Sequence, residues 1–436
     1  MRAGRFFVVN FQQVANGRQE ARQPKRQFRH LANMLKNLLV IIALVSLLQP
    51  AHAQDTTLTR LLRTNVYPLT ATGSQLVGTG WEKLRASIVQ SQFVLVGEDH
   101  GIAQIPQFTQ AVARELQPVA FITEIDRYQA ANLTRLTASP GLLTAYLKAS
   151  PGSLSFFSWG EEYELAQQLR AQKARIVGIE QVGLFTLGRF YEELANRVKN
   201  PSTRAYLQRE GAAYQRHDMA EFRSAGHSYS ILSQRQSALD SLELLTNTES
   251  PEARRMAQEY LLSHRIYKNQ VKGLGSHQAR VNLMKRNLLE GLRPLAPQPG
   301  QPLPKLLFKF GASHMARALS PWAGITDVGN LAQNLADVQD ARSLHLLVMG
   351  KQGTQVGGFN PDDPSKNIVP FDNSKETYLK PFADLSTGPA WQVFDLRPAR
   401  RALLNNQLKL TDQILVALLL GYDYFVLIPT ATASRS

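Results

Sequence analysis

Two histidines each stand three residues after a glycine at the end of a hydrophobic run. Residues 97–100 read GEDH and end in His100, and residues 311–314 read GASH and end in His314. A histidine whose tautomer is fixed by a carboxylate is suited to general-base catalysis, and two histidines with carboxylates are equally suited to bind a divalent metal. A glycine at the start of the motif allows a tight strand exit or a close backbone approach. The repeated pattern therefore predicts a chemical site.

Acidic residues follow the hydrophobic runs as well. Glu98 lies inside the first motif, Glu124 follows residues 119–123, and Glu180 follows residues 175–179. In open α/β sheets ligands bind beyond the carboxyl ends of the strands, so we expect these carboxylates and the two histidines to converge on one sheet edge. Taken singly, each residue also has a structural interpretation as a helix cap or a strand end. Their repeated placement is what favours a functional site.

The hydrophobic runs alternate with amphipathic segments over most of the chain. Helical periodicity marks residues 105–116 and 159–174. Short strand-like runs separated by helices predict an α/β fold with a mostly parallel sheet flanked by helices. The strand-like runs are 93–97, 119–124, 175–180, 305–311, 343–349 and 423–429.

The domain organisation follows from a change of pattern in the middle of the chain. Residues 54–183 form the first part of the predicted α/β core. Residues 184–304 are predicted to be a long inserted helical subdomain with a Pro-rich linker, because they lack strand-like runs and close on five prolines in residues 292–304. The core resumes over residues 305–436. Within it, residues 351–389 are rich in Gly, Asp, Asn, Pro and Ser, which predicts a long surface loop.

Several classes of chemistry are excluded by what the sequence lacks. The chain of 436 residues has no cysteine, which rules out disulfides, a thiol nucleophile, zinc fingers and iron–sulfur clusters. It also contains no Gly-X-Ser-X-Gly elbow, no Gly-X-X-X-X-Gly-Lys-Ser/Thr loop and no His-Glu-X-X-His helix. Water activated by a histidine or by a metal is the remaining route to hydrolysis.

The net charge of +15 is unevenly distributed along the chain. Residues 1–53 hold eight Lys or Arg and one acid, which leaves 41 basic and 33 acidic residues over positions 54–436. This remainder is only mildly basic and has no Lys/Arg run with interleaved aromatics, so we expect no nucleic-acid partner.

The N-terminus has the pattern of a signal peptide. Residues 38–48 read LLVIIALVSLL, too short to span a bilayer, and the small residues Ala51 and Ala53 follow. We expect cleavage after Ala53, export to the periplasm or the medium, and no stable membrane insertion afterwards. The long segment before Met34 makes Met34 an alternative to Met1 as the true start, and an organellar transit peptide is an alternative interpretation.

The motifs resemble those of the superfamily that joins erythromycin esterases, ChaN-like haem-binding proteins and the TIKI/TraB group. LVGEDHG at residues 95–101 is similar to the Gly-Glu-X-X-His-Gly of the esterases, with one residue fewer before the histidine. Residues 156–181 resemble their Trp-containing helix and the strand that follows it. Arg280, Met284 and Asn287 match their Arg-Asp-X-X-Met-X-X-Asn helix, with Val281 in place of the aspartate. GASHMARALS and GYDYFVLIP resemble the second histidine motif and the final strand.

The resemblance implies roles for individual residues. By analogy His100 is the base that activates water, while Glu98 and Glu124 orient it or stabilise charge. Arg280, on a helix, and His314 would supply cationic or hydrogen-bonding groups at the substrate. Because three positions depart from the esterase pattern, a macrolide lactone is not assumed as the substrate.

These observations lead to one main functional hypothesis and two alternatives. The main hypothesis is an exported, erythromycin esterase-like hydrolase that uses a His-activated water on an ester or amide of a small-molecule or peptide substrate. The alternatives are a ChaN-like protein that binds haem or another ligand, and a TIKI-type metal-dependent peptidase. The cofactor is accordingly left open between none, a divalent metal and haem.

Overall fold

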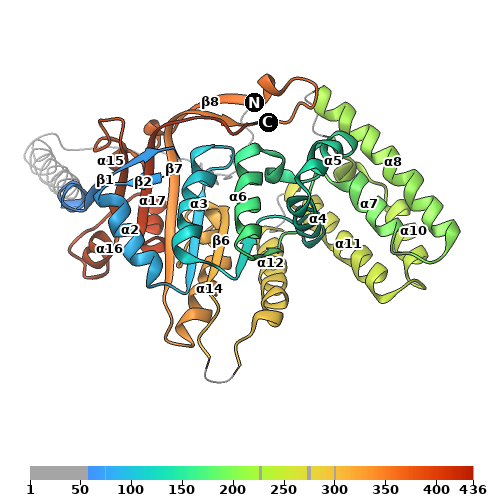
Figure 1. The fold of residues 1–436 in the computed structure, drawn as a ribbon, viewed down its shortest axis with the longest axis horizontal. Helices are drawn as coiled ribbons and strands as arrows, with labels where there is room; N and C mark the ends of the chain where they lie inside the picture. Colours follow the sequence, from blue (N-terminus) through green and yellow to red (C-terminus); the bar gives the residue numbers. More distant parts are fainter. Residues whose placement is uncertain (1–56, 74, 225–227, 273–275, 299–300, 436) are drawn as a thin grey trace, which may run out of the picture.

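The protein is built around a mostly parallel β-sheet flanked by helices (Figure 1). The computed structural model describes residues 57–73, 75–224, 228–272, 276–298 and 301–435. In this part of the chain the sheet has ten strands in the order β2-β1-β9-β10-β7-β3-β6-β4-β5, and β8 pairs with β7 outside that path. The predicted α/β fold class is confirmed. The predicted signal peptide lies outside the described residues.

Parallel pairing runs without interruption from β10 to β5, whereas β1, β2, β8 and β9 pair antiparallel with their neighbours. The parallel strands are the hydrophobic runs of the sequence, as expected for strands covered on both faces. The strands are β1 Val66–Thr72, β2 Gln75–Val77, β3 Phe93–Glu98, β4 Ala120–Thr123, β5 Arg175–Gly178, β6 Leu306–Gly311, β7 Ser343–Val356, β8 Ile368–Asp372, β9 Trp391–Asp395 and β10 Tyr424–Ala431.

Helices cover both faces of the sheet because each strand buries alternate side chains on opposite sides. In β3, Val94 and Val96 pack with α2, α3, α4 and α6, whereas Phe93 and Leu95 pack on the other face with α12 to α17. The helices of the first face are α2 Thr79–Val89, α3 Gln104–Leu116, α4 Arg127–Ala138 and α6 Gly160–Ala171, with α5 Leu143–Ala149 beside them. Those of the second face are α12 Ser276–Leu292, α13 Ala312–Met315, α14 Val328–Asp337, α15 Lys380–Ala383, α16 Arg397–Leu404 and α17 Gln413–Gly421.

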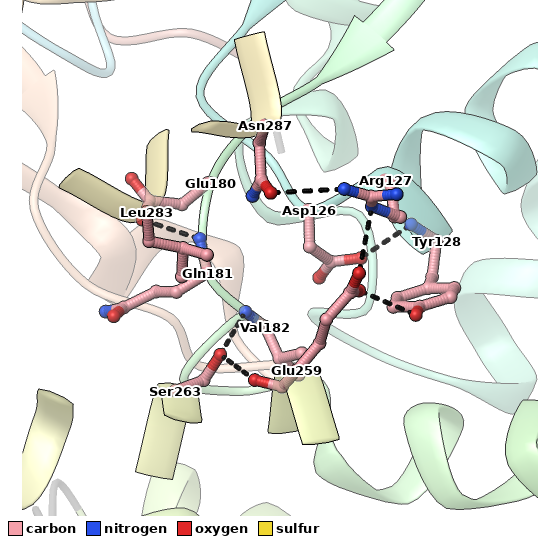
Figure 2. A pocket seen from close by; sticks show the side chains of 10 residues that line it. All are labelled: Asp126, Arg127, Tyr128, Glu180, Gln181, Val182, Glu259, Ser263, Leu283 and Asn287. Carbon is pink, nitrogen blue, oxygen red and sulfur yellow. Dashed lines mark hydrogen bonds and ion pairs between the residues drawn. The ribbon is translucent and has the colours of Figure 1, made fainter. Parts of the chain in front are cut away.

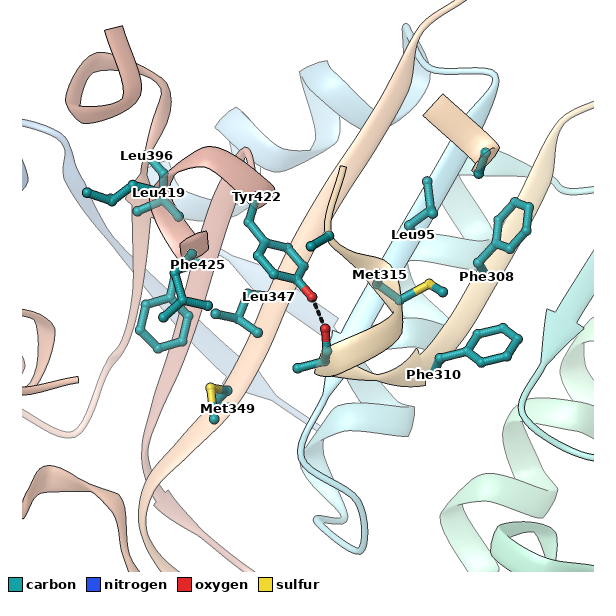
Figure 3. Close-up of a cluster of buried hydrophobic side chains, with 14 of the residues drawn as sticks. Leu95, Phe308, Phe310, Met315, Leu347, Met349, Leu396, Leu419, Tyr422 and Phe425 are labelled. Carbon is teal, nitrogen blue, oxygen red and sulfur yellow. Dashed lines mark hydrogen bonds between the residues drawn. The ribbon is translucent and has the colours of Figure 1, made fainter. Parts of the chain in front are cut away.

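A tyrosine in the hydrophobic core beneath α12 to α17 extends to the carboxyl ends of the strands (Figure 3). Tyr422 is fully buried, and its hydroxyl donates to the backbone carbonyl of Ala312. A buried hydroxyl needs such a partner, so the contact fixes the start of α13 against the core. A Cβ added to Gly97 would lie 2.7 Å from the same hydroxyl, and the glycine of the first motif is therefore required by packing.

Helices fill the chain between β5 and β6, apart from a short 3₁₀ turn, in the part that the structure describes. They form a unit beside the sheet, at the right of Figure 1. This unit has its own hydrophobic cluster, which includes Phe190, Tyr191, Leu242, Met256 and Tyr260. Its helices are α7 Leu187–Ala195, α8 Pro201–Arg223, α9 Ser230–Ser233, α10 Gln236–Thr246 and α11 Pro251–Val271. This separate core stabilises the packing of the helices within the unit, which lies beside the sheet.

The prediction of a long surface loop over residues 351–389 is wrong in part. Strand β7 continues to Val356, β8 returns antiparallel beside it over residues 368–372, and α15 follows. The turn-forming residues that suggested a loop lie between these elements. Side chains of β8 alternate between exposed and half-buried, so this strand lacks the continuous apolar run that marks the core strands.

Among the described residues, no helix is both long and apolar enough to cross a membrane.

Candidate active site

Four adjacent strands deliver the predicted site residues to one edge of the sheet. The order β3-β6-β4-β5 is parallel throughout, so the carboxyl ends of these strands lie together. Glu98 ends β3, Glu124 follows β4, Glu180 follows β5 and His314 lies in α13 after β6. The structure brings all of them, together with His100, into one connected network of contacts.

His100 is held between two carboxylates. Its Nδ1 lies 2.9 Å from Glu98 Oε1, its Nε2 lies 3.5 Å from Glu124 Oε2, and its ring stacks on Phe156 with centroids 4.2 Å apart. The side chain is 32% exposed. Burial alone would lower the pKa of His100, but Glu124 and Glu98 outweigh it and raise the pKa to about 10. His100 is therefore protonated at neutral pH and must release that proton before it can act as a base.

Glu124 is the centre of the network. Its Oε1 accepts a 2.8 Å hydrogen bond from Arg280 Nη2, and its Oε2 accepts a 2.7 Å bond from the Gly311 N–H. His314 Nε2 lies 3.5 Å from Oε1, so both histidines face the same carboxylate. Burial opposes ionisation of Glu124, but His314 and His100 hold its pKa well below the usual range. Glu124 is thus a fixed negative charge at this edge.

Arg280 extends into the site from α12 and lies between Glu124 and Glu180. Its side chain is 12% exposed, and it lies against Glu180, with Nη2 2.5 Å from Oε2 and Nε 3.1 Å from both oxygens. Burial opposes the charge, but Glu180 and Glu124 raise the pKa of Arg280 above its usual value. An Arg–carboxylate pair with two donors has defined geometry, so Arg280 is fixed toward the strand ends rather than toward solvent.

His314 has a buried partner on its far side. Its Nδ1 lies 2.9 Å from Oδ2 of Asp327, and its side chain is 4% exposed. His277, three residues before Arg280 on α12, stacks near it with ring centroids 5.9 Å apart. Sequence reasoning missed both partners. The spacing of His277 and Arg280 on one helix face was an available signal, whereas Asp327 gives none because only the fold brings it here.

Lys309 is the other residue that sequence reasoning missed. It lies in the middle of β6 and its Nζ donates to Glu98 Oε1 at 2.6 Å and to Glu162 Oε1 at 2.5 Å. All three side chains are at most 4% exposed. Burial raises the pKa of Glu162 to about 7, although Lys309 opposes it. A lysine inside an apolar strand must have buried partners, and this was the signal in LLFKFG.

Gly311 is the second glycine that the site requires. A Cβ at this position would lie 2.9 Å from His100 Nε2 and 3.5 Å from Glu124 Oε2. The backbone of the second motif therefore touches the histidine of the first. Any larger residue would displace His100 from the carboxylates that hold it.

The donor set at the strand ends does not fit a metal site. Within the residues that the structure describes, no three His, Asp or Glu side chains gather as a metal-binding group. The carboxylates at the strand ends lie against Arg280 and Lys309, which neutralise them. Both ring nitrogens of His100 lie near carboxylates, Nδ1 at 2.9 Å from Glu98 and Nε2 at 3.5 Å from Glu124.

A small polar cavity lies behind Glu180, between α4, α11 and α12 (Figure 2). Its volume is about 10 Å³, which is room for about one water. Arg127 on its wall donates to Asn287 at 3.1 Å and to Glu290 at 2.8 Å, and Asp126 caps α4. The cavity is too small for a substrate.

Comparison with known proteins finds likeness in solved structures alone. No model of a protein family matches the chain, and no curated protein matches it. A mutant of the erythromycin esterase EreC, in its open conformation, superposes with a TM-score of 0.51 over 84% of this chain and 98% of its own, at 15% identity. The chain has the erythromycin esterase fold. The resemblance inferred from the motifs is confirmed at this level.

Two further solved structures are similar to the chain in fold. A protein from Bacillus cereus has a TM-score of 0.52 and 15% identity, and it covers 87% of this chain and 98% of its own. A succinoglycan biosynthesis protein has a TM-score of 0.50 and 11% identity, with 88% and 99% covered. At these identities the likeness concerns the fold, and the chemistry has to be argued from the site.

Proposed function

We propose that the protein is a hydrolase that cleaves an ester or amide with a water molecule activated by His100. The observation that carries the proposal is the contrast in exposure at the strand ends. His100 is 32% exposed, whereas Glu98, Glu124 and His314, which face it or share its carboxylate, are at most 8% exposed. A reactive imidazole at the surface with a buried, charged frame behind it is the arrangement that general-base catalysis needs.

Each neighbour has a part in the proposed reaction. Glu98 accepts from Nδ1 of His100 and so leaves Nε2 to take a proton from water. Arg280 and His314 are cationic groups next to Glu124, and they would stabilise the oxyanion that forms when water attacks the carbonyl. The absence of a serine elbow and of cysteine in the sequence supports direct attack by water instead of an acyl-enzyme.

The substrate is proposed only by class, as an ester or amide of a small molecule or peptide. This chain departs from the esterase pattern at three places in or beside the site. These are the shorter GEDH motif, Val281 and Glu180. Glu180 binds Arg280 directly, so its extra methylene compared with aspartate alters where the guanidinium sits. A macrolide lactone is therefore not part of the proposal.

The test is a screen of ester and amide substrates against the parent, His100→Ala and His217→Ala, with and without a chelator. His217 is an exposed histidine of α8 whose Nε2 contacts the Ser228 carbonyl, far along the chain from the strand ends, and it serves as the matched control. We expect His100→Ala to lower turnover by about 10² to 10⁴ with an unchanged melting temperature. His217→Ala and the chelator should leave turnover unchanged.

Three results would contradict the proposal. Undiminished turnover in His100→Ala would remove the histidine from the chemistry. Loss of turnover with chelator would favour a metal-dependent peptidase. A Soret band on titration with haem, without turnover on any substrate, would favour a binding protein.

A further inference from the structure

Asp327 is a carboxylate with no exposed surface beside His314. Its Oδ2 lies 2.9 Å from His314 Nδ1, and its Oδ1 accepts a 2.7 Å hydrogen bond from the Val328 N–H at the start of α14. A buried charge is costly unless it is paired and hydrogen-bonded, and here both oxygens have partners. Asp327 thus has one oxygen for the fold and one for the histidine.

This contact decides which nitrogen of His314 faces the site. Because Nδ1 is engaged by Asp327, Nε2 is the nitrogen that points to Glu124, 3.5 Å away. Helix α13 has four residues, too few to fix a side chain by helix packing alone. The ring is otherwise bounded by Phe310 and His277, with centroids 6.4 and 5.9 Å from its own.

The charges around His314 keep a proton on it. Burial alone would lower the pKa of His314, but Asp327 and Glu124 outweigh it and raise the pKa to about 9. From α12, His277 and Arg280 face the same cluster. Burial, His314 and Arg280 lower the pKa of His277 to about 4, so His277 is neutral at neutral pH. His314 is therefore the imidazole in this pair that carries a transferable proton.

We infer that Asp327 is a positioning residue that holds His314 as the proton donor to the leaving group, an inference that rests on the proposed hydrolysis. In that reaction water loses a proton to neutral His100 and its oxygen bonds to the carbonyl carbon. The bond from that carbon to the leaving oxygen or nitrogen then breaks, and the leaving group takes the proton from His314 Nε2. Solvent afterwards removes the proton from His100 and returns one to His314, so atoms and charge balance.

The experiment compares turnover from pH 6 to 10 in the parent, Asp327→Asn and Asp412→Asn. Asparagine retains the capping ability of aspartate but not its charge. Asp412 caps α17 through the N–H groups of Ile414 and Leu415, and it is the matched control for the loss of a capping carboxylate. Because His100 has to lose a proton and His314 has to keep one, parent turnover should stop rising near pH 9.

In Asp327→Asn the rise of turnover with pH should stop about 1 to 3 pH units lower than in the parent. The reason is that loss of one nearby negative charge lowers the pKa of His314 by about that amount. The plateau should then fall about 10- to 1,000-fold, with turnover at pH 6 close to that of the parent. A purely structural role would instead lower turnover equally at every pH. Asp412→Asn should keep the parent profile.

A second measurement keeps the inference testable if Asp327→Asn fails to fold. The ¹⁵N resonances of His314 in the parent should show a protonated Nδ1 and a titration near pH 9. Titration near pH 6.5, or an unmoved profile in Asp327→Asn while His100-dependent turnover persists, would overturn the inference. Absence of any His100-dependent turnover would instead overturn the proposed function. The titration of His314 would still decide whether Asp327 keeps the proton on His314.

Discussion

Replacing Lys309 by methionine removes the cation that lies between two buried carboxylates. Methionine fills a similar volume without the charge, so the change isolates electrostatics from packing. Glu98 retains His100 as a partner, 2.9 Å away, but Glu162 retains none, because its second oxygen is already buried without a hydrogen bond. Glu162 must then be protonated in the folded protein over a wide pH range.

The expected cost follows from linkage between protonation and folding. In the parent the pKa of Glu162 is about 7, above its unfolded value. The contribution of Glu162 to the free energy of unfolding therefore falls as pH rises toward 7 and then levels off. In Lys309→Met the pKa of Glu162 rises further, and stability should keep falling above pH 7 by about 1.4 kcal/mol per pH unit. At pH 9 we expect the free energy of unfolding to be lower than that of the parent by about 3 to 5 kcal/mol.

Urea unfolding at pH 6 and pH 9 measures this difference. The double variant Lys309→Met with Glu162→Gln is the control, because it leaves no unpaired buried carboxylate and should recover part of the loss at pH 9. A loss below about 1 kcal/mol at pH 9, or a loss equal at both pH values, would refute the view that Lys309 compensates a buried charge.

Further outcomes are expected from the same geometry. Gly311→Ala should lower turnover by about 100-fold while the protein still folds, because the added Cβ displaces His100; steady-state kinetics with a melting curve checks this. Parent turnover should rise about 50-fold from pH 7 to pH 9, because the neutral fraction of His100 grows about 90-fold while about half of His314 loses its proton. A profile that falls over this range would assign His100 as an acid. Mass spectrometry of the exported product should find Gln54 as its first residue, and a product that retains residues 38–48 would disprove the cleavage.

The site residues at the strand ends could be predicted because each is identified by the residues next to it in the sequence. A hydrophobic run followed by Glu98 and His100, or by Glu124, identifies a strand and its carboxyl end without knowledge of the partner strands. Parallel pairing then determines that these ends meet. Arg280 needed more than its own surroundings, since an arginine on a polar helix is ordinarily exposed, and the resemblance to the esterases supplied its role.

Other features depend on contacts between distant segments. Asp327 meets His314 only because α14 begins beside α13, and nothing in the local sequence distinguishes Asp327 from the other aspartates that cap helices. The antiparallel strands β1, β2 and β9 were also not predicted. They lie toward one edge of the sheet, where short or partly exposed strands lack a continuous apolar run.

The division of labour between sheet and helical unit has a consequence for how the protein can diversify. Strand ends supply every proposed proton-transfer group, whereas helices α7 to α11 are stabilised by their own core. They connect to the chemistry through α12, which is anchored to the sheet where the Asn287 amide donates to the Ile179 carbonyl at 2.9 Å. Insertions or exchanges between β5 and α12 can therefore change the helical unit while the proton-transfer residues stay in place.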